Sequence, residues 1–270
     1  MVKFRFGRAG VALVPLAFCL LVAGCSDTEQ AYKDEPVEQL YNEAVDLMME
    51  GSWSKAGKAF DEVDRQHPYS VWATKAQVMG AYVAYEGGKY DDAISAADRF
   101  IQLHPGNRDT AYAYYIKAIS YYEQIVDIER DQRDTQNAMN ALQDLINRFP
   151  GSRYARDARL KLDLTRDHLA GKEMEIGRFY ENRGLCVGAI NRYRAVINQY
   201  QTTTHVPEAL ARLTECYTSL GLPEEAGKNA AVLGYNYPDS DWYQDSYDLV
   251  QGQRTTEQKG WLSRVIDHVL

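Results

Sequence analysis

The chain has 270 residues, of which 45% are hydrophobic and 25% are charged, as is ordinary for a folded globular protein. Its 38 acidic residues outnumber its 30 basic ones, and the formal net charge is −8. This balance excludes nucleic acid as an expected partner, because that partner requires a basic footprint. An anionic membrane surface should not attract the folded body either, so any membrane attachment would come from a separate segment.

The first 24 residues are typical of a bacterial export signal. Lys3, Arg5 and Arg8 form a basic start, and residues 11–21 form an apolar stretch that is too short to span a bilayer comfortably. The stretch runs into the sequence Leu-Val-Ala-Gly-Cys at 21–25, which resembles a bacterial lipobox. We therefore expect residues 1–24 to be a lipoprotein signal peptide. A plain secretory signal, with Cys25 buried, is the alternative.

The lipobox resemblance implies that the Cys25 thiol accepts a diacylglycerol group. Two or three acyl chains anchor a protein stably where a single chain would not. Ser26 follows the cysteine, whereas aspartate there would resemble an inner-membrane retention signal. We expect the outer membrane as location, with the body on the periplasmic side. Residues 25–36 would then be a lipidated, polar tether.

Residues 87–105 contain the unit that organises the rest of the chain. Gly87 and Gly88 suit a tight turn, apolar residues then recur at spacings of three and four, and Pro105 ends the segment. The same pattern returns around five alanines. These are Ala56, Ala93, Ala138, Ala189 and Ala226. Their spacing fits the ~34-residue period of a helical-hairpin repeat with short linkers and insertions.

Each of these segments follows another helix that has a small or aromatic residue at the matching position. Those residues are Ala44, Ala81, Ala118, Gly177 and Tyr217. Small residues there let two helices approach closely, and an aromatic or large apolar residue often follows the alanine by four positions. The sequence therefore predicts an all-α protein, a solenoid of about five helical hairpins of the tetratricopeptide (TPR) type. An ordinary helical bundle is the alternative.

The repeats are expected to fall into two groups. Residues 37–150 would hold repeats 1–3, and residues 151–242 would hold repeats 4 and 5, joined by one extended helix or two nearly continuous ones over 152–184. Residues 243–270 would form a capping helix and a tail. The charged stretch 127–135 lacks an apolar stripe, which favours a solvated loop over a contact loop.

No catalytic or metal-binding pattern is apparent in the sequence. The five histidines are scattered, with no two at the spacing of metal ligands. We expect no enzyme activity, no cofactor and no metal. A helical body of a lytic transglycosylase would need a separate catalytic domain, and no residues remain to build one. Cys186 and Cys216 fall in adjacent hairpins, and an oxidising periplasm would permit a disulfide between them. The alternative is two buried thiols.

Several runs of residues resemble one family closely. They are FIQLHP (100–105), AYAYYIKAIS (111–120), RFPGSRYARDA (148–158), GKEMEIGRFYENRG (171–184), GAINRYRAVINQYQTT (188–203) and EALARLTECYTSLGL (208–222). This set is similar to the BamD (ComL) family, the TPR lipoproteins of the outer-membrane β-barrel assembly (BAM) machinery. The resemblance covers nearly all of the chain after the signal segment, including the order of the repeats.

The resemblance implies a non-enzymatic scaffold that promotes the folding and insertion of barrel proteins. Its implied partners are a POTRA domain of BamA, other BAM lipoproteins and unfolded outer-membrane β-barrel proteins. Asn191, Arg192 and Arg194 match the part of the family that docks BamA, with Arg192 as the ion-pairing residue. A substrate groove would be lined by Tyr82, Tyr85, Tyr112, Tyr115 and Tyr122. Another periplasmic TPR lipoprotein, such as a pilotin or a cell-envelope scaffold, is the alternative.

Overall fold

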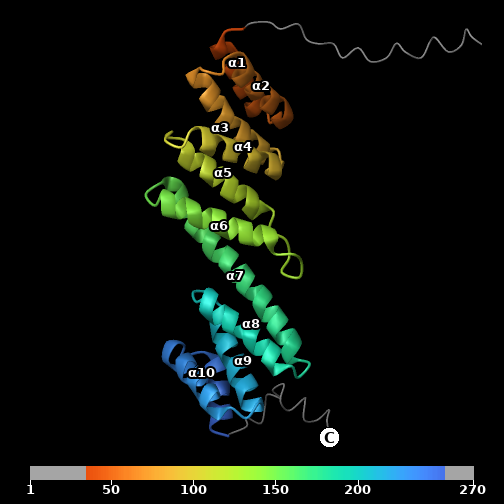
Figure 1. Ribbon diagram of the computed structural model, residues 1–270, viewed down its shortest axis with the longest axis vertical. Coiled ribbons are helices and arrows are strands. Elements are labelled where there is room, and N and C mark those ends of the chain that lie inside the picture. Colours follow the sequence, from red (N-terminus) through yellow and green to blue (C-terminus); the bar gives the residue numbers. More distant parts are fainter. Residues whose placement is uncertain (1–34, 253–270) are drawn as a thin grey trace, which may run out of the picture. The chain divides into compact units, whose positions relative to one another are not determined.

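The computed structural model describes residues 35–252, which form eleven helices and no strand (Figure 1). The helices are α1 (Val37–Met49), α2 (Trp53–Gln66), α3 (Val71–Glu86), α4 (Tyr90–Leu103), α5 (Thr110–Glu123), α6 (Arg133–Arg148), α7 (Arg153–Glu181), α8 (Cys186–Gln199), α9 (Val206–Ser219), α10 (Pro223–Asn236) and α11 (Asp241–Val250). The signal segment, Cys25, most of the tether and the tail after 252 lie outside the described residues.

The helices pack as five successive hairpins followed by α11. Each helix contacts its neighbours in the sequence, and the first helices of adjacent hairpins also touch, as α1 does α3 and α3 does α5. The predicted all-α, TPR-type solenoid is confirmed. All of these helices belong to one compact unit, which begins at Val37. The finer division into two repeat groups at 150/151 stays a prediction.

The hairpin turns depend on glycine in four of the five hairpins. Gly51, Gly88, Gly184 and Gly221 each have a φ between 70° and 72°, in the left-handed region that a residue with a Cβ rarely adopts. A serine begins three of the helices: the side chains of Ser70, Ser152 and Ser240 each accept a hydrogen bond from the backbone N–H three residues later. Local sequence thus fixes where helices begin and turn.

The repeat alanines are all at the core of their hairpins. Ala56, Ala93, Ala138, Ala189 and Ala226 are each at most 1% exposed. The large residues four positions later are buried too, among them Phe60, Leu142 and Tyr193. The buried side chains form four clusters that follow one another along the chain. This serial core is what a solenoid requires, since each repeat packs only on its neighbours.

Helix α7 is a single helix of 29 residues, so the extended form predicted for this region is the one observed. Its first half packs on α6 and its second half on α8. Residues 127–132 of the charged stretch lie in the loop between α5 and α6, whereas residues 133–135 form the first turn of α6. Thr135 is buried, because it lies on the packed face of that helix. Among the described residues, no helix combines the length and apolar character needed to cross a membrane.

Candidate functional site

The five predicted groove tyrosines lie on α3 and α5, and Tyr154 of α7 packs against two of them. The rings of Tyr82 and Tyr112 are 6.3 Å apart, and both Tyr112 and Tyr115 stack on Tyr154, with centroids 5.2 and 5.1 Å away. Tyr85 pairs with Tyr90 beside them. Lys161 lies 5.3 Å from the ring centre of Tyr122, the fifth tyrosine. We call Tyr82, Tyr85, Tyr112, Tyr115, Tyr122 and Tyr154 the tyrosine cluster; all six are partly exposed.

Carboxylates border the tyrosine cluster. The Tyr115 hydroxyl donates to Asp157 over 2.8 Å, and the Tyr85 hydroxyl donates to Glu123 over 3.4 Å. Burial, together with Glu123, raises the pKa of Tyr85 to about 12, and burial with Asp157 raises the pKa of Tyr115 above its usual range. The phenols therefore stay protonated at any physiological pH. The surface offers aromatic faces, and the hydroxyl groups of Tyr85 and Tyr115 already have carboxylate partners.

A separate hollow of about 850 Å³ lies between α2, α3 and α4. None of the five predicted tyrosines lines it. Gly57 and Gly80 form part of its wall, and a Cβ added at either would meet nothing within 4 Å. Lysines and aspartates of α2, together with Asp92 and Arg99 of α4, border it, so its rim carries both signs of charge. This hollow is not apparent from helical periodicity, because three helices contribute to it.

Asn191 and Arg192 lie in a smaller hollow of about 370 Å³ between α7 and α8. Nη1 of Arg192 is 3.2 Å from Oε2 of Glu173, and the Arg192 side chain is 43% exposed. Arg192 therefore already has a partner within the chain. Its guanidinium has five N–H donors, so this pair leaves donors free for a second carboxylate. Arg194 is exposed but does not line the hollow, because two residues along a helix point to different faces.

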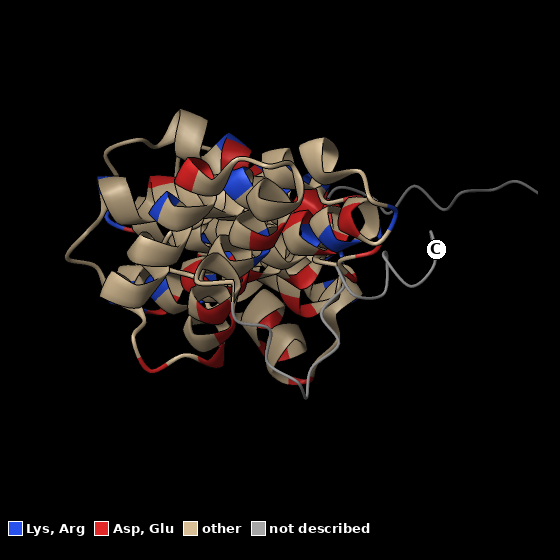
Figure 2. Ribbon diagram, turned by 90° about the horizontal axis from the view of Figure 1, so that it is seen from below, with Lys and Arg blue, Asp and Glu red and all other residues tan. Residues whose placement is uncertain are grey.

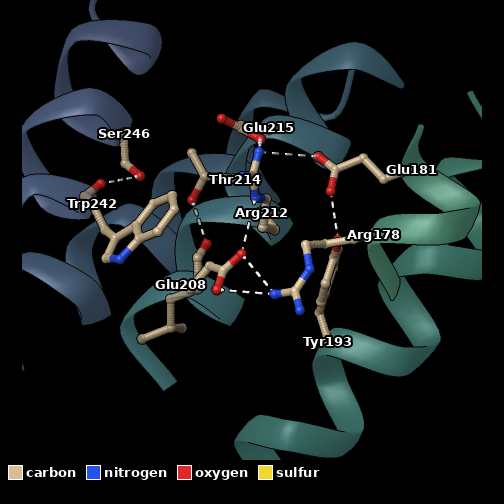
Figure 3. Close-up of polar contacts among 10 residues, drawn as sticks. Arg178, Glu181, Tyr193, Glu208, Arg212, Thr214, Glu215, Trp242 and Ser246 are labelled. Atoms are coloured by element: carbon tan, nitrogen blue, oxygen red, sulfur yellow. Dashed lines mark hydrogen bonds and ion pairs between the residues drawn. The ribbon is translucent and has the colours of Figure 1, made fainter. Parts of the chain in front are cut away.

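An ionic cluster lies beneath this surface, where α7, α8 and α9 meet (Figure 3). We call Arg178, Glu181, Glu208, Arg212 and Glu215 the junction cluster. Nη1 of Arg178 donates to both carboxylate oxygens of Glu208 at 3.1 Å, and Nη1 of Arg212 donates to Glu215 at 2.9 Å. The guanidinium of Arg212 also lies 5.3 Å from the ring centre of Trp242 on α11. The cluster thus links helices α7, α9 and α11.

Glu181 is the most deeply buried member, at 2% exposure. Oε2 of Glu181 accepts a hydrogen bond of 2.5 Å from the Tyr193 hydroxyl. Oε1 has no hydrogen-bond partner, and the nearest cation, Nη1 of Arg212, is 3.9 Å away. Burial raises the pKa of Glu181 to about 8, helped by the neighbouring Glu215 and opposed by Tyr193 and Arg212. Burial and Glu181 in turn raise the pKa of the Tyr193 phenol.

The ring of Tyr193 also packs closely against Gly177, which has no side chain. The ring occupies the space above Gly177, where an added Cβ would lie 2.4 Å from Cε1 of the ring. The small residue expected in the first helix of the fourth repeat is thus required by the tyrosine of the second helix. This contact and the hydrogen bond to Glu181 fix both the edge and the tip of the ring.

Cys186 and Cys216 are both buried, and no bond joins them in this structure. Sγ of Cys186 lies 3.1 Å from the Ser219 hydroxyl, which donates to the carbonyl oxygen of Cys216. Burial, with Glu181 and the Cys186 thiol beside it, raises the pKa of the Cys216 thiol. The structure therefore brings the two cysteines together across α8 and α9. The disulfide between them stays a prediction.

Sequence reasoning missed the junction cluster and Tyr154. A signal for the cluster was available in α9, where Glu208, Arg212 and Glu215 recur at helical spacing between buried residues. Glu181 also follows Gly177 by one helical turn and is therefore on the buried stripe of α7. Charged residues on an apolar stripe indicate a buried pair. The pattern does not say which charges meet.

Charges of both signs are interspersed along the helices rather than separated (Figure 2). Among the described residues, no group of three or more His, Cys, Asp and Glu side chains could hold a metal ion. Stacked helical hairpins with a serial core define a helical-repeat protein of the TPR type.

The chain belongs to the YfiO family of outer membrane lipoproteins, whose profile matches residues 33–233. The outer membrane protein assembly factor BamD of Caulobacter vibrioides is 48% identical over 254 residues, which cover 93% of this chain and 83% of the relative. The factor of the same name from Rickettsia prowazekii is 44% identical over 237 residues, or 87% of this chain and 94% of the relative. The resemblance to the BamD family is confirmed.

Solved structures include more distant helical-repeat proteins. A TPR protein of Thermus thermophilus is 18% identical, with a TM-score of 0.38, over 80% of this chain and 99% of that one. The TPR2AB domain of yeast Sti1 is 13% identical, with a TM-score of 0.41, over 80% of this chain and 83% of that one.

Proposed function

We propose that this protein is a non-enzymatic scaffold of the outer-membrane β-barrel assembly complex. In this proposal it is anchored by lipid at Cys25 on the periplasmic face of the outer membrane. It binds BamA, works beside the other lipoproteins of the complex, and promotes the folding and insertion of unfolded barrel proteins. The observation that carries the proposal is membership of a family whose relatives are named assembly factors, over nearly the whole folded body.

The proposed BamA site is the hollow that contains Asn191 and Arg192, with the exposed Arg194 beside it. Arg192 is half-exposed and oriented by Glu173, which suits a guanidinium that must receive a carboxylate from another protein. An exposed ion pair alone contributes little. The orienting partner and the adjoining hollow favour a larger role for Arg192, since both restrict its geometry before binding.

The proposed substrate site is the tyrosine cluster. Partly exposed aromatic rings that pack on one another suit the apolar and aromatic side chains of an extended barrel strand. The bordering carboxylates Glu123 and Asp157 would favour strands with basic or amide groups at their edges.

Capture of the tagged full-length protein from its own envelope in mild detergent tests the scaffold role. Mass spectrometry should recover BamA in near-stoichiometric amount. Arg192→Glu should reduce that recovery at least about tenfold, the size of effect expected when one partner of an interfacial charge pair is reversed. Arg156→Glu changes an exposed arginine on α7 and is the matched control. Recovery of other envelope proteins without BamA would overturn the proposal.

Binding of an unfolded barrel protein tests the second site. Tyr85→Ala should weaken binding, because the ring and its contact with Tyr90 are lost. Tyr235→Ala removes a tyrosine that is 87% exposed on α10 and should leave binding unchanged. Equal binding by both variants would contradict the assignment of the tyrosine cluster.

A further inference from the structure

The junction cluster contains three carboxyl groups but only two guanidinium groups. Its two guanidinium groups, Arg178 and Arg212, are engaged most closely by Glu208 and Glu215, at 3.1 and 2.9 Å. Glu181 is left without a cation of its own and is almost completely buried. An ionised carboxylate in that position would be desolvated, and only the shared guanidinium of Arg212, 3.9 Å away, would offset that cost, which is unfavourable.

Every element packed around Glu181 contributes to its environment. Helix α7 provides Arg178, helix α8 provides Tyr193 and Cys186, and helix α9 provides Glu208, Arg212, Glu215 and Cys216. Helix α11 adds Asp245, which acts on Arg212. With Glu181 uncharged, the two arginines balance Glu208 and Glu215.

We propose that Glu181 is uncharged in the folded protein, with its proton on Oε1 and turned toward Glu215, and that this neutral carboxyl fixes α8 on α7 and α9 and so positions Arg192. Oε2 accepts from Tyr193, and Oε1 is the oxygen that no N–H reaches. A protonated Oε1 satisfies both atoms, because a carboxylic acid can accept at one oxygen and donate from the other.

The positional part follows from the place of Tyr193 on α8. Its ring is confined above Gly177, and its hydroxyl ends on Glu181, so the rotation of α8 about its own axis is set at this residue. Arg192 and Asn191 precede it directly and face the hollow beside Glu173. Glu181 is thus a positioning residue for the proposed BamA site, and this part rests on the proposed function.

Raising the pH should therefore weaken the junction. The folded state retains a proton that the unfolded state releases above the ordinary glutamate pKa of about 4.3. Stability from this group is complete below that pH and is lost as the pH rises toward 8, where folded Glu181 also ionises. The direction is opposite to that of a carboxylate stabilised by a salt bridge.

Thermal unfolding of the full-length protein between pH 5 and pH 8 tests the uncharged state. Glu181→Gln preserves the pattern of one acceptor and one donor, so its Tm should match the wild type at pH 5 and exceed it by at least about 3 °C at pH 8. Glu175→Gln on the same helix, at a side chain 37% exposed, should follow the wild type throughout. If the Tm of Glu181→Gln and that of the wild type changed equally between pH 5 and pH 8, the proposal would be overturned.

Infrared difference spectroscopy gives a readout that stability alone does not. At pH 7 the wild type should show the carbonyl stretch of a protonated carboxylic acid, and Glu181→Gln should lack it. Absence of that band from the wild type would overturn the uncharged state even if the variant is stable.

Affinity for the periplasmic domains of BamA, measured from pH 7 to pH 9, tests the positioning role. The wild type should lose several-fold more affinity than Glu181→Gln over this range. An equal loss in both proteins would remove the positioning role. Unchanged binding by Arg192→Glu would instead refute the proposed BamA site, while the Tm and infrared results on Glu181 would still stand.

Discussion

The first two hairpins and the junction of α7, α8 and α9 share one repeat architecture but are stabilised differently. In α1–α4 the interior is apolar, with Phe60 and Phe100 each 1% exposed among alanines and valines. At the junction an apolar core is also present, yet it encloses a carboxyl group, a tyrosine hydroxyl and two thiols.

This difference matters because the two kinds of contact respond to different changes. Apolar packing depends on volume and is insensitive to pH. A buried polar cluster depends on donor and acceptor geometry, and its members cost free energy whenever one is left unpaired. The same repeat architecture can therefore be stabilised by apolar packing in one region and by a buried polar cluster in another.

The largest expected loss of stability comes from a cavity in the apolar core of α1–α4. Phe60→Ala should lower the free energy of unfolding by about 3–5 kcal/mol, because a fully buried ring is replaced by a cavity. Denaturant unfolding at pH 6 and pH 8 should give the same loss, since no charge is involved. A loss that changes with pH would break the proposed contrast between the two regions.

The predicted disulfide would strengthen the junction by a comparable amount. Closing a loop of about thirty residues between Cys186 and Cys216 should add about 3–4 kcal/mol. Alkylation of the unfolded, unreduced protein should modify neither cysteine, and a reductant should lower Tm in the wild type but not in Cys186→Ala. Alkylation of both thiols before reduction would show that the junction is held without a covalent link.

Gly177→Ala should destabilise the junction of α7, α8 and α9 by a steric clash, without any change of charge. The added Cβ would lie 2.4 Å from Cε1 of Tyr193, whose ring is fully buried, so we expect a loss of about 1–3 kcal/mol. Gly57→Ala in α2 is the matched control: nothing lies within 4 Å, and the change should stabilise the helix by up to about 1 kcal/mol. Denaturant unfolding of both variants measures the difference, and equal effects would contradict it.

The smallest effect compares removal of one hydroxyl group in each region. Tyr193→Phe leaves buried Glu181 without its donor and should cost about 1–3 kcal/mol. Tyr115→Phe should cost only about 0.5–1 kcal/mol, because Asp157 keeps Lys161 at 3.3 Å and is partly exposed. Chemical denaturation of the two variants gives the ratio. A larger loss of unfolding free energy in Tyr115→Phe than in Tyr193→Phe would contradict this prediction.

Most of the fold follows from local sequence. The alanines at 56, 93, 138, 189 and 226, the left-handed glycines and the prolines after the second helices fix helix limits and pairing order, because each acts through sterics within a few residues. The tyrosines of α3 and α5 were placed on one surface by the family resemblance, not by local sequence, because the two helices belong to different repeats. The predicted charged loop lies between α5 and α6, but it ends at residue 132, because α6 begins at Arg133.

Contacts between repeats could not be read from periodicity. The periodic pattern gives a face for each helix but not the partner opposite it. Tyr154 therefore entered the tyrosine cluster, Glu173 became the partner of Arg192, and the α2–α4 hollow appeared, only once helices were packed. Arg194 shows the converse, since it is adjacent to Arg192 in sequence but lies outside the hollow.

The sequence by itself determined that this is a helical-hairpin repeat protein, and resemblance placed it in its family. Both depend on patterns that repeat every few residues or persist over the whole chain. The tertiary structure alone decided that Glu181, Tyr193 and Gly177 meet, and that the third carboxyl of the junction shares its nearest cation, Arg212, with Glu208 and Glu215. Burial and charge balance belong to the packed arrangement of several helices, so no single segment encodes them.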